Sequence, residues 1–130
     1  MDIIGIGTDI VECVRIGRMI EQHGELFLNR VFTEREIRYC QERKRAVEHF
    51  AGRWAAKESV LKALDVGWRR GMSLTEVEIR NELGGRPQVH LCGAAKEAAQ
   101  NRRVSDILLS IARCRAYATA YALAVRGAGL

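Results

Sequence analysis

The chain has 130 residues, of which 48% are hydrophobic and 6% aromatic, and its formal net charge at pH 7 is +5. This length and composition predict one compact domain over residues 1–130 with no linker. They exclude a long disordered tract, because the chain has one proline and no Ser- or Pro-rich segment. They also exclude a membrane-spanning helix, since no stretch reaches about 18 apolar residues.

The positive charge predicts an anionic partner: a nucleic acid, a phosphorylated small molecule or an acidic protein. A nucleic acid is disfavoured, because no run interleaves aromatic residues with Lys or Arg. The four cysteines form no C-x-x-C pair, which argues against structural zinc and favours free thiols. The first residues lack the features of a signal peptide, so we expect a cytoplasmic protein with no membrane association.

The first half of the chain reads as one strand and three helices. Residues 3–8 form a β-branched run, which places Asp9 near the loop that follows it. Residues 14–23 have helical spacing with a basic outward side. Thr33 and Glu36 have the spacing of a capping box, which predicts a helix over residues 33–41. A long helix is expected over residues 46–64, with Gly67 as its stop signal.

The second half reads as two hairpins separated by a helix. Residues 74–80 and 88–91 form the first hairpin, with its turn at 81–86. An Ala-rich helix is expected over 94–100, and strands 106–112 and 117–125 form the second hairpin. This order predicts an α+β fold with a small antiparallel sheet packed against a long helix.

One carboxylate, Glu58, falls inside the apolar stripe of the long helix, between Trp54 and Leu61. A carboxylate buried there is neutral, paired or bound to a metal ion. The simplest alternative is an exposed i,i+4 pair with Lys62, which contributes only about 0.3–0.5 kcal/mol. For Asp9 the simplest alternative is a helix cap or a turn.

If the long helix packs across the sheet edge, Asp9 and Glu58 converge there. Two carboxylates without a convergent His or Cys suit Mg²⁺, which fills its remaining positions with water and substrate phosphates. Basic residues surround the same helix at 43–45, Arg53, Lys57 and Lys62, as expected for a polyphosphate substrate. The alternative for these basic residues is that they only form a solvated helix face without a ligand. None of the three histidines is assigned a role.

Two separated motifs resemble those of the holo-[acyl-carrier-protein] synthases, the small bacterial type of 4′-phosphopantetheinyl transferase. Residues 5–12 (GIGTDIVE) are similar to the N-terminal signature of that family. Residues 50–63 (FAGRWAAKESVLKA) match its second motif, W/F-A-A-K-E-x-x-x-K-A. Residues 77–80, 85–87 and the final hairpin also fall where the family has them, so the resemblance covers nearly the whole chain.

The resemblance implies the 4′-phosphopantetheinyl transferase fold and a reaction. The 4′-phosphopantetheine arm of coenzyme A is transferred to a serine of apo-acyl carrier protein, and adenosine 3′,5′-bisphosphate is released. It also implies Mg²⁺ as the metal, an acidic carrier as the partner and a homotrimer with active sites between subunits. Fatty acid biosynthesis is the implied pathway, although the residues themselves leave the carrier open.

The resemblance also implies site residues. Asp9 and Glu58 match metal ligands, and Glu58 and Lys62 match catalytic positions; either one is a candidate to deprotonate the serine. Carrier contacts are implied at Arg15, Met19 and Phe27, although Glu21 and Glu25 weaken that basic patch. Contacts to coenzyme A are implied at Lys44, Arg45, Arg53, Gly85, Pro87 and Arg113.

The chain departs from the family pattern at two places. Ala112 and Arg113 replace a hydroxyl residue and a histidine on the penultimate strand; an arginine there can contact phosphate but cannot act as a base near neutral pH. Asp65 stands where the family commonly has glycine, and it either repels coenzyme A phosphates or faces water. These departures keep one alternative open, a non-catalytic homologue that binds coenzyme A or a carrier. The basic charge of the chain leaves a second, a basic domain that binds nucleic acid, against which the absence of aromatic platforms counts.

Overall fold

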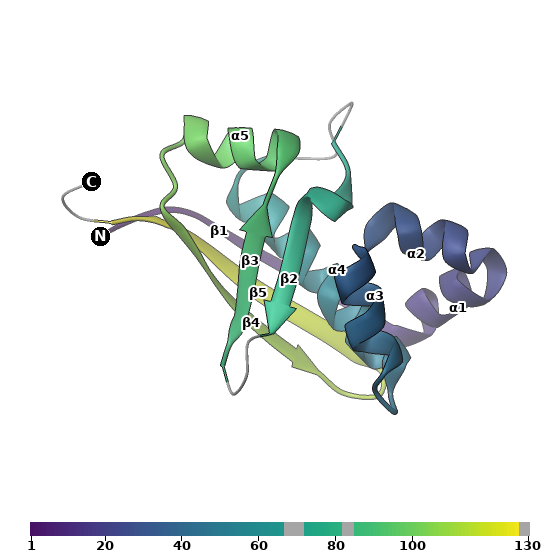
Figure 1. Cartoon of the computed structure of the whole chain (residues 1–130). Helices are drawn as coiled ribbons and strands as arrows, with labels where there is room; N and C mark the ends of the chain where they lie inside the picture. The colour runs from purple at the N-terminus through teal and green to yellow at the C-terminus, as the bar shows by residue number, and fades with distance from the viewer. Residues whose placement is uncertain (67–71, 82–84, 128–130) are drawn as a thin grey trace.

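The structure is a computed structural model that describes residues 1–66, 72–81 and 85–127. Along the described chain (Figure 1) the elements are β1 (Asp2–Glu12), α1 (Cys13–His23), α2 (Glu25–Val31), α3 (Glu34–Gln41), α4 (Ala46–Ala63), a 3-10 turn (Leu74–Glu76), β2 (Val77–Asn81), β3 (Pro87–Leu91), α5 (Gly93–Asn101), β4 (Asp106–Arg113) and β5 (Tyr117–Arg126). The predicted α+β class is confirmed.

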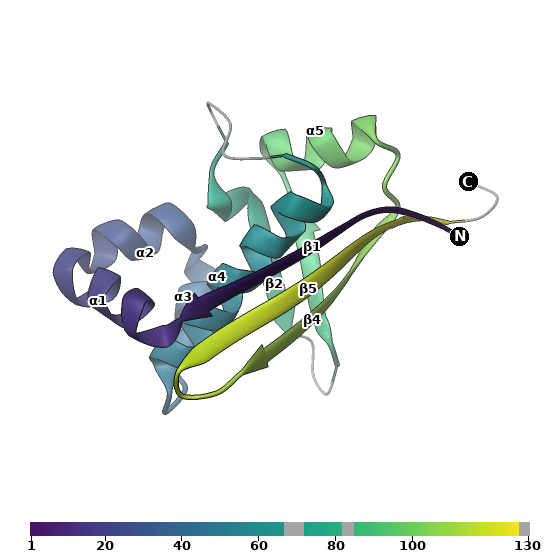
Figure 2. The ribbon, with the colours of Figure 1, turned by 180° about the vertical axis from the view of Figure 1, so that it is seen from behind.

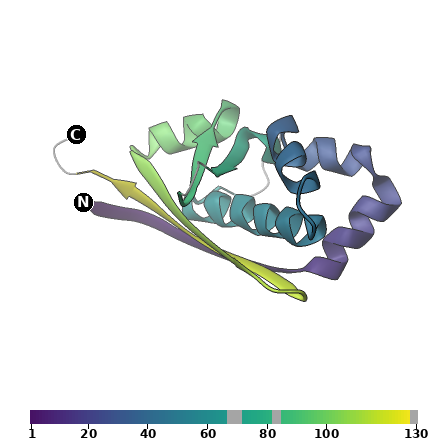
Figure 3. The same ribbon diagram turned by 60° about the horizontal axis from the view of Figure 1, so that its bottom comes forward.

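The strands form two antiparallel sheets, one with the order β1-β5-β4 and the other with β2-β3. Both predicted hairpins are present, with Val77 opposite Leu91 in one and Asp106 opposite Val125 in the other. We expected a single sheet; the strands make two because the β2-β3 hairpin forms its ladder only with itself. Helix α4 lies along one face of the three-stranded sheet (Figure 3), and none of the helices that the structure describes lies on the opposite face (Figure 2).

Small residues let α4 lie directly on β1 and β5. A Cβ atom added to Gly7 would come within 1.9 Å of the Ser59 carbonyl oxygen, and one added to Gly5 within 2.0 Å of the Ala63 oxygen. On β5 the residues that face the helix are four buried alanines: Ala118, Ala120, Ala122 and Ala124. The helix backbone therefore approaches the strands more closely than larger side chains would permit.

The fully buried charge of α4 is Lys57, not Glu58. Its ammonium lies 2.6 Å from a carboxylate oxygen of Glu36 on α3. It also donates hydrogen bonds to the carbonyl oxygens of Leu74 and Val77, at 3.0 and 2.7 Å. A single apolar stripe was the wrong description of this helix, because α4 is covered by the sheet on one side and by α3 and β2 on another. Lys57 therefore belongs to the core rather than to a basic rim.

The predicted capping box begins α3, and its glutamate has further partners. Thr33 accepts a hydrogen bond from the Glu36 backbone N–H, while the Glu36 carboxylate accepts one from the Thr33 N–H. The other oxygen of Glu36 accepts from the Ile79 N–H at 2.8 Å, in addition to the contact with Lys57. Glu36 thus connects α3, α4 and β2.

Helix α4 ends at Ala63, in an arrangement that explains Asp65. Asp65 has φ +56°, and the N–H groups of Asp65 and Val66 bond back to the carbonyls of Lys62 and Leu61, both at 3.0 Å. This is the helix end at which glycine is normally favoured. Asp65 is exposed, so of the two possibilities that the sequence left open, repulsion of coenzyme A phosphates or contact with water, the structure favours contact with water. The predicted stop at Gly67 lies outside the described residues, as do residues 82–84 of the predicted turn at 81–86.

One helix was missed, and two local expectations were wrong. Helix α2 was not predicted, because its seven residues are too few for a clear period. Residues 74–76 form a 3-10 turn capped by Ser73 instead of the start of a strand. Strand β1 extends to Glu12, so Asp9 lies within a strand, opposite Ala120 of β5, and not beside a loop. None of the helices in the described ranges has the length and apolar character needed to span a bilayer.

Candidate active site

The structure brings Asp9 of β1 and Glu58 of α4 together. Burial, followed by the charge of Asp9, raises the pKa of Glu58, so the two carboxylates lie close enough to repel each other. Lys62 does not form the helical pair with Glu58 that was the simplest alternative to a metal site. Its ammonium lies 3.2 Å from the Asp9 carboxylate and donates to the Thr8 carbonyl oxygen at 2.8 Å. We call Asp9, Glu58 and Lys62 the acidic corner.

The strand and the helix each determine part of this geometry. Asp9 is two residues from both Gly7 and Val11, so all three lie on the same face of β1. Gly7 and Val11 are buried, which identifies this face as the one that faces α4. Glu58 and Lys62 are four residues apart, so they lie one above the other on the same helix face. A Cβ atom added to Gly7 would lie only 2.9 Å from the Cβ of Lys62, so the absence of a side chain at Gly7 lets Lys62 lie this close to β1. The close packing of β1 on α4 therefore sets the spacing of the corner.

The donor set of the acidic corner fits a hard divalent cation. Its two carboxylates supply oxygen ligands, and in the described ranges no group of three or more His, Cys, Asp or Glu side chains competes as a metal site. Two carboxylates are the number that Mg²⁺ commonly takes from a protein when substrate phosphates complete its coordination. Arg15 of α1 is near enough for its charge to lower the pKa of Glu58, which adds a cation beside the corner.

Arginines gather around Tyr39, at the end of α3. The guanidinium carbons of Arg43 and Arg53 lie 3.3 and 4.0 Å from the centre of its ring. Arg53 is buried and donates to the Asn81 side-chain oxygen at 2.6 Å. The ring of His49 packs edge-on against Tyr39 at 6.0 Å, and Arg113 of β4 lies 3.2 Å from its Nε2. We call these five residues, Tyr39, Arg43, His49, Arg53 and Arg113, the Tyr39 cluster.

The electrostatics of the Tyr39 cluster are strongly positive. Burial, together with the charges of Arg113, Arg43 and Arg53, lowers the pKa of His49 to about 4. His49 is therefore neutral at pH 7, and because an arginine only donates, its Nε2 accepts from Arg113. Two predicted substrate-binding residues, Arg53 and Arg113, are brought together here. Tyr39 and His49 were missed, since their sequence separation from β4 gave no local signal, and Arg43 was expected only as one of the basic residues around the long helix.

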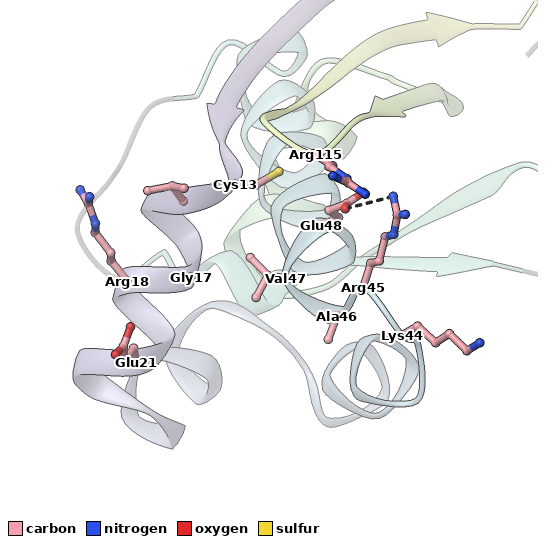
Figure 4. Close-up of a pocket in the computed structure, with 11 residues that line it drawn as sticks. Cys13, Gly17, Arg18, Glu21, Lys44, Arg45, Ala46, Val47, Glu48 and Arg115 are labelled. Atoms are coloured by element: carbon pink, nitrogen blue, oxygen red, sulfur yellow. Dashed lines mark ion pairs between the residues drawn. The ribbon is translucent and has the colours of Figure 1, made fainter.

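A groove of about 750 Å³ lies between α1 and the start of α4 (Figure 4). The predicted coenzyme A contacts Lys44 and Arg45 line one side of it, and Arg18 of α1 and Arg115 of the β4–β5 turn also line it. Arg45 is paired with Glu48 at 3.7 Å. The remaining predicted contacts are near the β2-β3 hairpin: Gly85 is exposed, and Pro87 lies opposite Asn81, the partner of Arg53.

The predicted carrier-binding residues differ in exposure. Arg15 is exposed and Met19 is partly buried. Phe27 is only 7% exposed and packs against Phe32 and Trp54, with ring centres 6.2 Å apart in both pairs. Its neighbour Leu26 is 65% exposed and was missed. Met19, Leu26 and Phe27 line one hollow of about 150 Å³ between α1 and α2.

Taken together, fold and acidic corner define a small α+β domain of the kind that transfers a phosphate-linked group. The chain belongs to the 4′-phosphopantetheinyl transferase superfamily, whose family model matches residues 5–125.

Individual relatives agree with this assignment. A protein of Rhodopirellula baltica named holo-[acyl-carrier-protein] synthase is 47% identical over 121 residues, which is 93% of this chain and 96% of the relative. The crystal structure of holo-[acyl-carrier-protein] synthase from Neisseria meningitidis has a TM-score of 0.87 at 30% identity, covering 96% of this chain and all (100%) of that one. A Bacillus anthracis holo-(acyl-carrier-protein) synthase, solved in complex with CoA (3′,5′-ADP), has a TM-score of 0.78 at 31% identity, covering 96% and 98%. The predicted family and fold are thus confirmed.

Proposed function

We propose that this protein is a holo-[acyl-carrier-protein] synthase, acting as a single domain over residues 1–130. It transfers the 4′-phosphopantetheine group of coenzyme A to a serine of apo-acyl carrier protein and releases adenosine 3′,5′-bisphosphate. The observation that carries the proposal is the acidic corner, in which residues of both matched motifs meet: Asp9 from the first, and Glu58 and Lys62 from the second. Relatives that are 47% and 44% identical to this chain over most of its length bear the same name.

The proposed chemistry uses these side chains directly. The serine oxygen attacks the phosphorus that carries pantetheine, the bond from that phosphorus to the bridging oxygen breaks, and the leaving bisphosphate takes the electron pair. Glu58 is the proposed acceptor of the serine proton, with Lys62 as the alternative. The Lys62 ammonium stabilises charge that develops on the phosphate oxygens. Mg²⁺, which Asp9 and Glu58 would hold, neutralises pyrophosphate charge when it is bound.

The proposed protein partner is an acidic carrier, and α1 and α2 provide the surface for it. Arg15 and Arg18 are exposed cations on α1, and beside them Met19 and Leu26 provide apolar contact area. Phe27 supports this surface from beneath, since its ring is buried. Cations next to an apolar hollow suit the docking of a negatively charged helix.

The proposed assembly is a homotrimer with active sites between subunits. Support comes from the helix-free face of the three-stranded sheet, where large apolar side chains are exposed: Ile6, Ile10, Tyr117 and Tyr121. Such a patch on a protein surface usually marks an interface. The arrangement of α4 gives further support, because Arg53 and Glu58 are five residues apart and so point about 140° away from each other around the helix. A second copy is then needed for one ligand to contact both.

The remaining parts of the proposal are a cytoplasmic location, fatty acid biosynthesis as the pathway, and no nucleic acid or membrane partner. The location is supported by four free cysteines: Cys13, Cys40, Cys92 and Cys114. Free thiols persist where the compartment is reducing.

The test incubates the purified protein with coenzyme A, Mg²⁺ and apo-carriers, and measures the carrier by mass spectrometry. We expect a mass gain of one phosphopantetheine; the absence of any gain, with a reference transferase modifying the same carriers, refutes the proposal. Glu58→Gln is expected to abolish transfer while thermal unfolding stays close to that of the parent. The alternative, a homologue that only binds, is favoured by Arg113 and Ala112, and it predicts tight calorimetric binding of coenzyme A without transfer.

A further inference from the structure

Two cysteines lie together beside the β4–β5 turn, which comprises residues 114–116. Cys13 is the first residue of α1, and its thiol donates a hydrogen bond to the carbonyl oxygen of Cys114, with 3.7 Å between sulfur and oxygen. Figure 4 shows the sulfur of Cys13 pointing toward Arg115 of the same turn. The two cysteines are 101 positions apart in the sequence, so the fold brings them together.

Backbone hydrogen bonds hold both cysteines against the turn. The Cys13 N–H donates to the Ala116 carbonyl oxygen, and the Cys114 N–H donates to the Tyr117 carbonyl oxygen, both at 2.9 Å. The turn lies outside the ladder, since β4 ends at Arg113 and β5 begins at Tyr117. A three-residue turn can shift without breaking the ladder. It can therefore bring the Cys114 sulfur into disulfide geometry, which requires Cα atoms about 4.4–6.8 Å apart.

The two thiols differ in exposure, which sets the order in which they react. Cys114 is exposed, whereas Cys13 is only 4% exposed. Burial, followed by Glu48 and the Cys114 thiol, raises the pKa of Cys13, and the charge of Arg113 opposes this shift. A soluble oxidant therefore meets Cys114 first. Cys13 then has the position of a resolving thiol, which lies beside the reactive one but is shielded from solvent.

We propose that Cys13 and Cys114 form a reversible disulfide when a low-molecular-weight disulfide oxidises the protein, and that this bond slows group transfer. The Cys114 thiolate attacks one sulfur of the small disulfide, and the other sulfur leaves as a thiolate. The Cys13 thiol then loses its proton and attacks the Cys114 sulfur, which releases the second small thiolate. The two cysteines lose two electrons in total, and one small disulfide is reduced to two thiols.

The effect on transfer follows from the residues that adjoin the two cysteines. Cys114 directly follows Arg113, a predicted coenzyme A contact. Cys13 and Arg115 line the groove between α1 and the start of α4 (Figure 4). A bond that draws the turn toward α1 therefore displaces both arginines. This effect rests on the proposed function, whereas the disulfide itself does not.

Mass spectrometry of the intact protein tests the disulfide. The protein carries Cys92→Ser, because Cys92 is also exposed and would take up the reagent. After treatment with oxidised glutathione, we expect a species lighter by two hydrogens, a cross-linked peptide that joins Cys13 to Cys114, and full reversal by dithiothreitol. When Cys13→Ser is added, a glutathione adduct at Cys114 should persist instead. An adduct that persists at Cys114 while Cys13 is present overturns the proposal, as does a link to Cys40 or to a second copy of the chain.

Transfer rates test the consequence of the bond. The assay follows removal of glutathione and uses S-alkylated coenzyme A, whose blocked thiol cannot reduce the disulfide. The oxidised protein is expected to modify the carrier about tenfold more slowly or worse, the scale of loss that follows displacement of a positioning contact. Dithiothreitol should restore the rate. The matched control adds Cys114→Ser to Cys92→Ser, and its rate should be the same with and without oxidation.

The two measurements separate this inference from the proposed function. If the disulfide forms but the transfer rate is unchanged, the proposed slowing of transfer is overturned. If the reduced protein modifies no carrier, the proposed function fails, and the mass measurement still decides whether Cys13 and Cys114 form the bond. If transfer proceeds but oxidation produces only glutathione adducts, the function stands and the inference is overturned.

Discussion

Lys57 and Glu36 form an ion pair in which both side chains are 0% exposed, with 2.6 Å between Nζ and Oε1. Lys57 is the first lysine of the motif that also contains Glu58, yet its ammonium points into the core, toward Glu36 and the carbonyls of Leu74 and Val77. The two neighbouring residues therefore have separate roles: one fixes α4 to α3 and β2, and the other faces the acidic corner.

Replacing Lys57 by Met is expected to destabilise the protein by about 3–5 kcal/mol, because it leaves a buried carboxylate without its partner. Chemical denaturation of the parent and the variant measures the loss. The control is the double change Lys57→Met with Glu36→Gln, which removes both charges and should recover part of the stability. A loss below about 1 kcal/mol in the single variant would contradict the assignment.

Replacing Asp65 by Gly is expected to stabilise the protein by about 0.5–1 kcal/mol. Asp65 has φ +56°, which glycine adopts without strain. Thermal unfolding measures the gain, and the transfer rate should stay unchanged, since Asp65 is exposed. Asp65→Ala is the matched control and should lower the melting temperature. A slower transfer reaction in Asp65→Gly would show that the carboxylate has a role at the site.

Replacing Gly7 by Ala is expected to cost about 1–3 kcal/mol or more, since the added Cβ would meet the Ser59 carbonyl oxygen at 1.9 Å. Gly17→Ala is the control: its Cβ would meet Val47 at 3.5 Å, an ordinary contact, and alanine favours α1 by about 0.5–1 kcal/mol. The two variants should therefore shift the denaturation midpoint in opposite directions. Equal effects would mean that β1 and α4 separate easily.

His49 is expected to make stability depend on pH. Burial and then Arg113, Arg43 and Arg53 lower its pKa to about 4, while Glu48 acts in the opposite direction. The unfolded chain binds a proton near pH 6.5 and the folded chain does so only near pH 4. The unfolded state thus holds more protons in this window, and stability falls as the pH drops from about 6.5 to about 4.

Unfolding free energies measured from pH 7 to pH 4 test this dependence. His49→Gln cannot take up a proton and should show a shallower loss over the window, whereas His23→Gln, an exposed position, should follow the parent. Parallel curves for the parent and His49→Gln would contradict the prediction.

Local patterns predicted the local structure well. The spacing of Thr33 and Glu36 predicted the start of α3, the alternation of residues 74–80 predicted the first hairpin, and strand-forming composition predicted the second. These features depend on interactions within a few residues. The 18-residue helix α4 was also predicted, but its buried side was not, because burial there comes from two neighbours far away in sequence.

The candidate site was predicted only in part for the same reason. Asp9 and Glu58 were expected to meet, and the structure brings them together, although Asp9 lies within a strand. The Lys57–Glu36 pair and the contact of His49 with Arg113 join residues 21 and 64 positions apart, and no local pattern indicates either one. Conversely, Phe27 matched a surface position of the family and proved to be buried, with Leu26 exposed beside it.

The glycines of β1 limit the routes by which this protein can diverge. A larger residue at Gly5 or Gly7 is tolerated only if α4 moves away from the strand, and such a movement carries Glu58 away from Asp9. Changes that would improve packing at this contact therefore alter the spacing of the two carboxylates at the same time. The glycines and the acidic corner can change only together, so we expect them to be inherited as one unit.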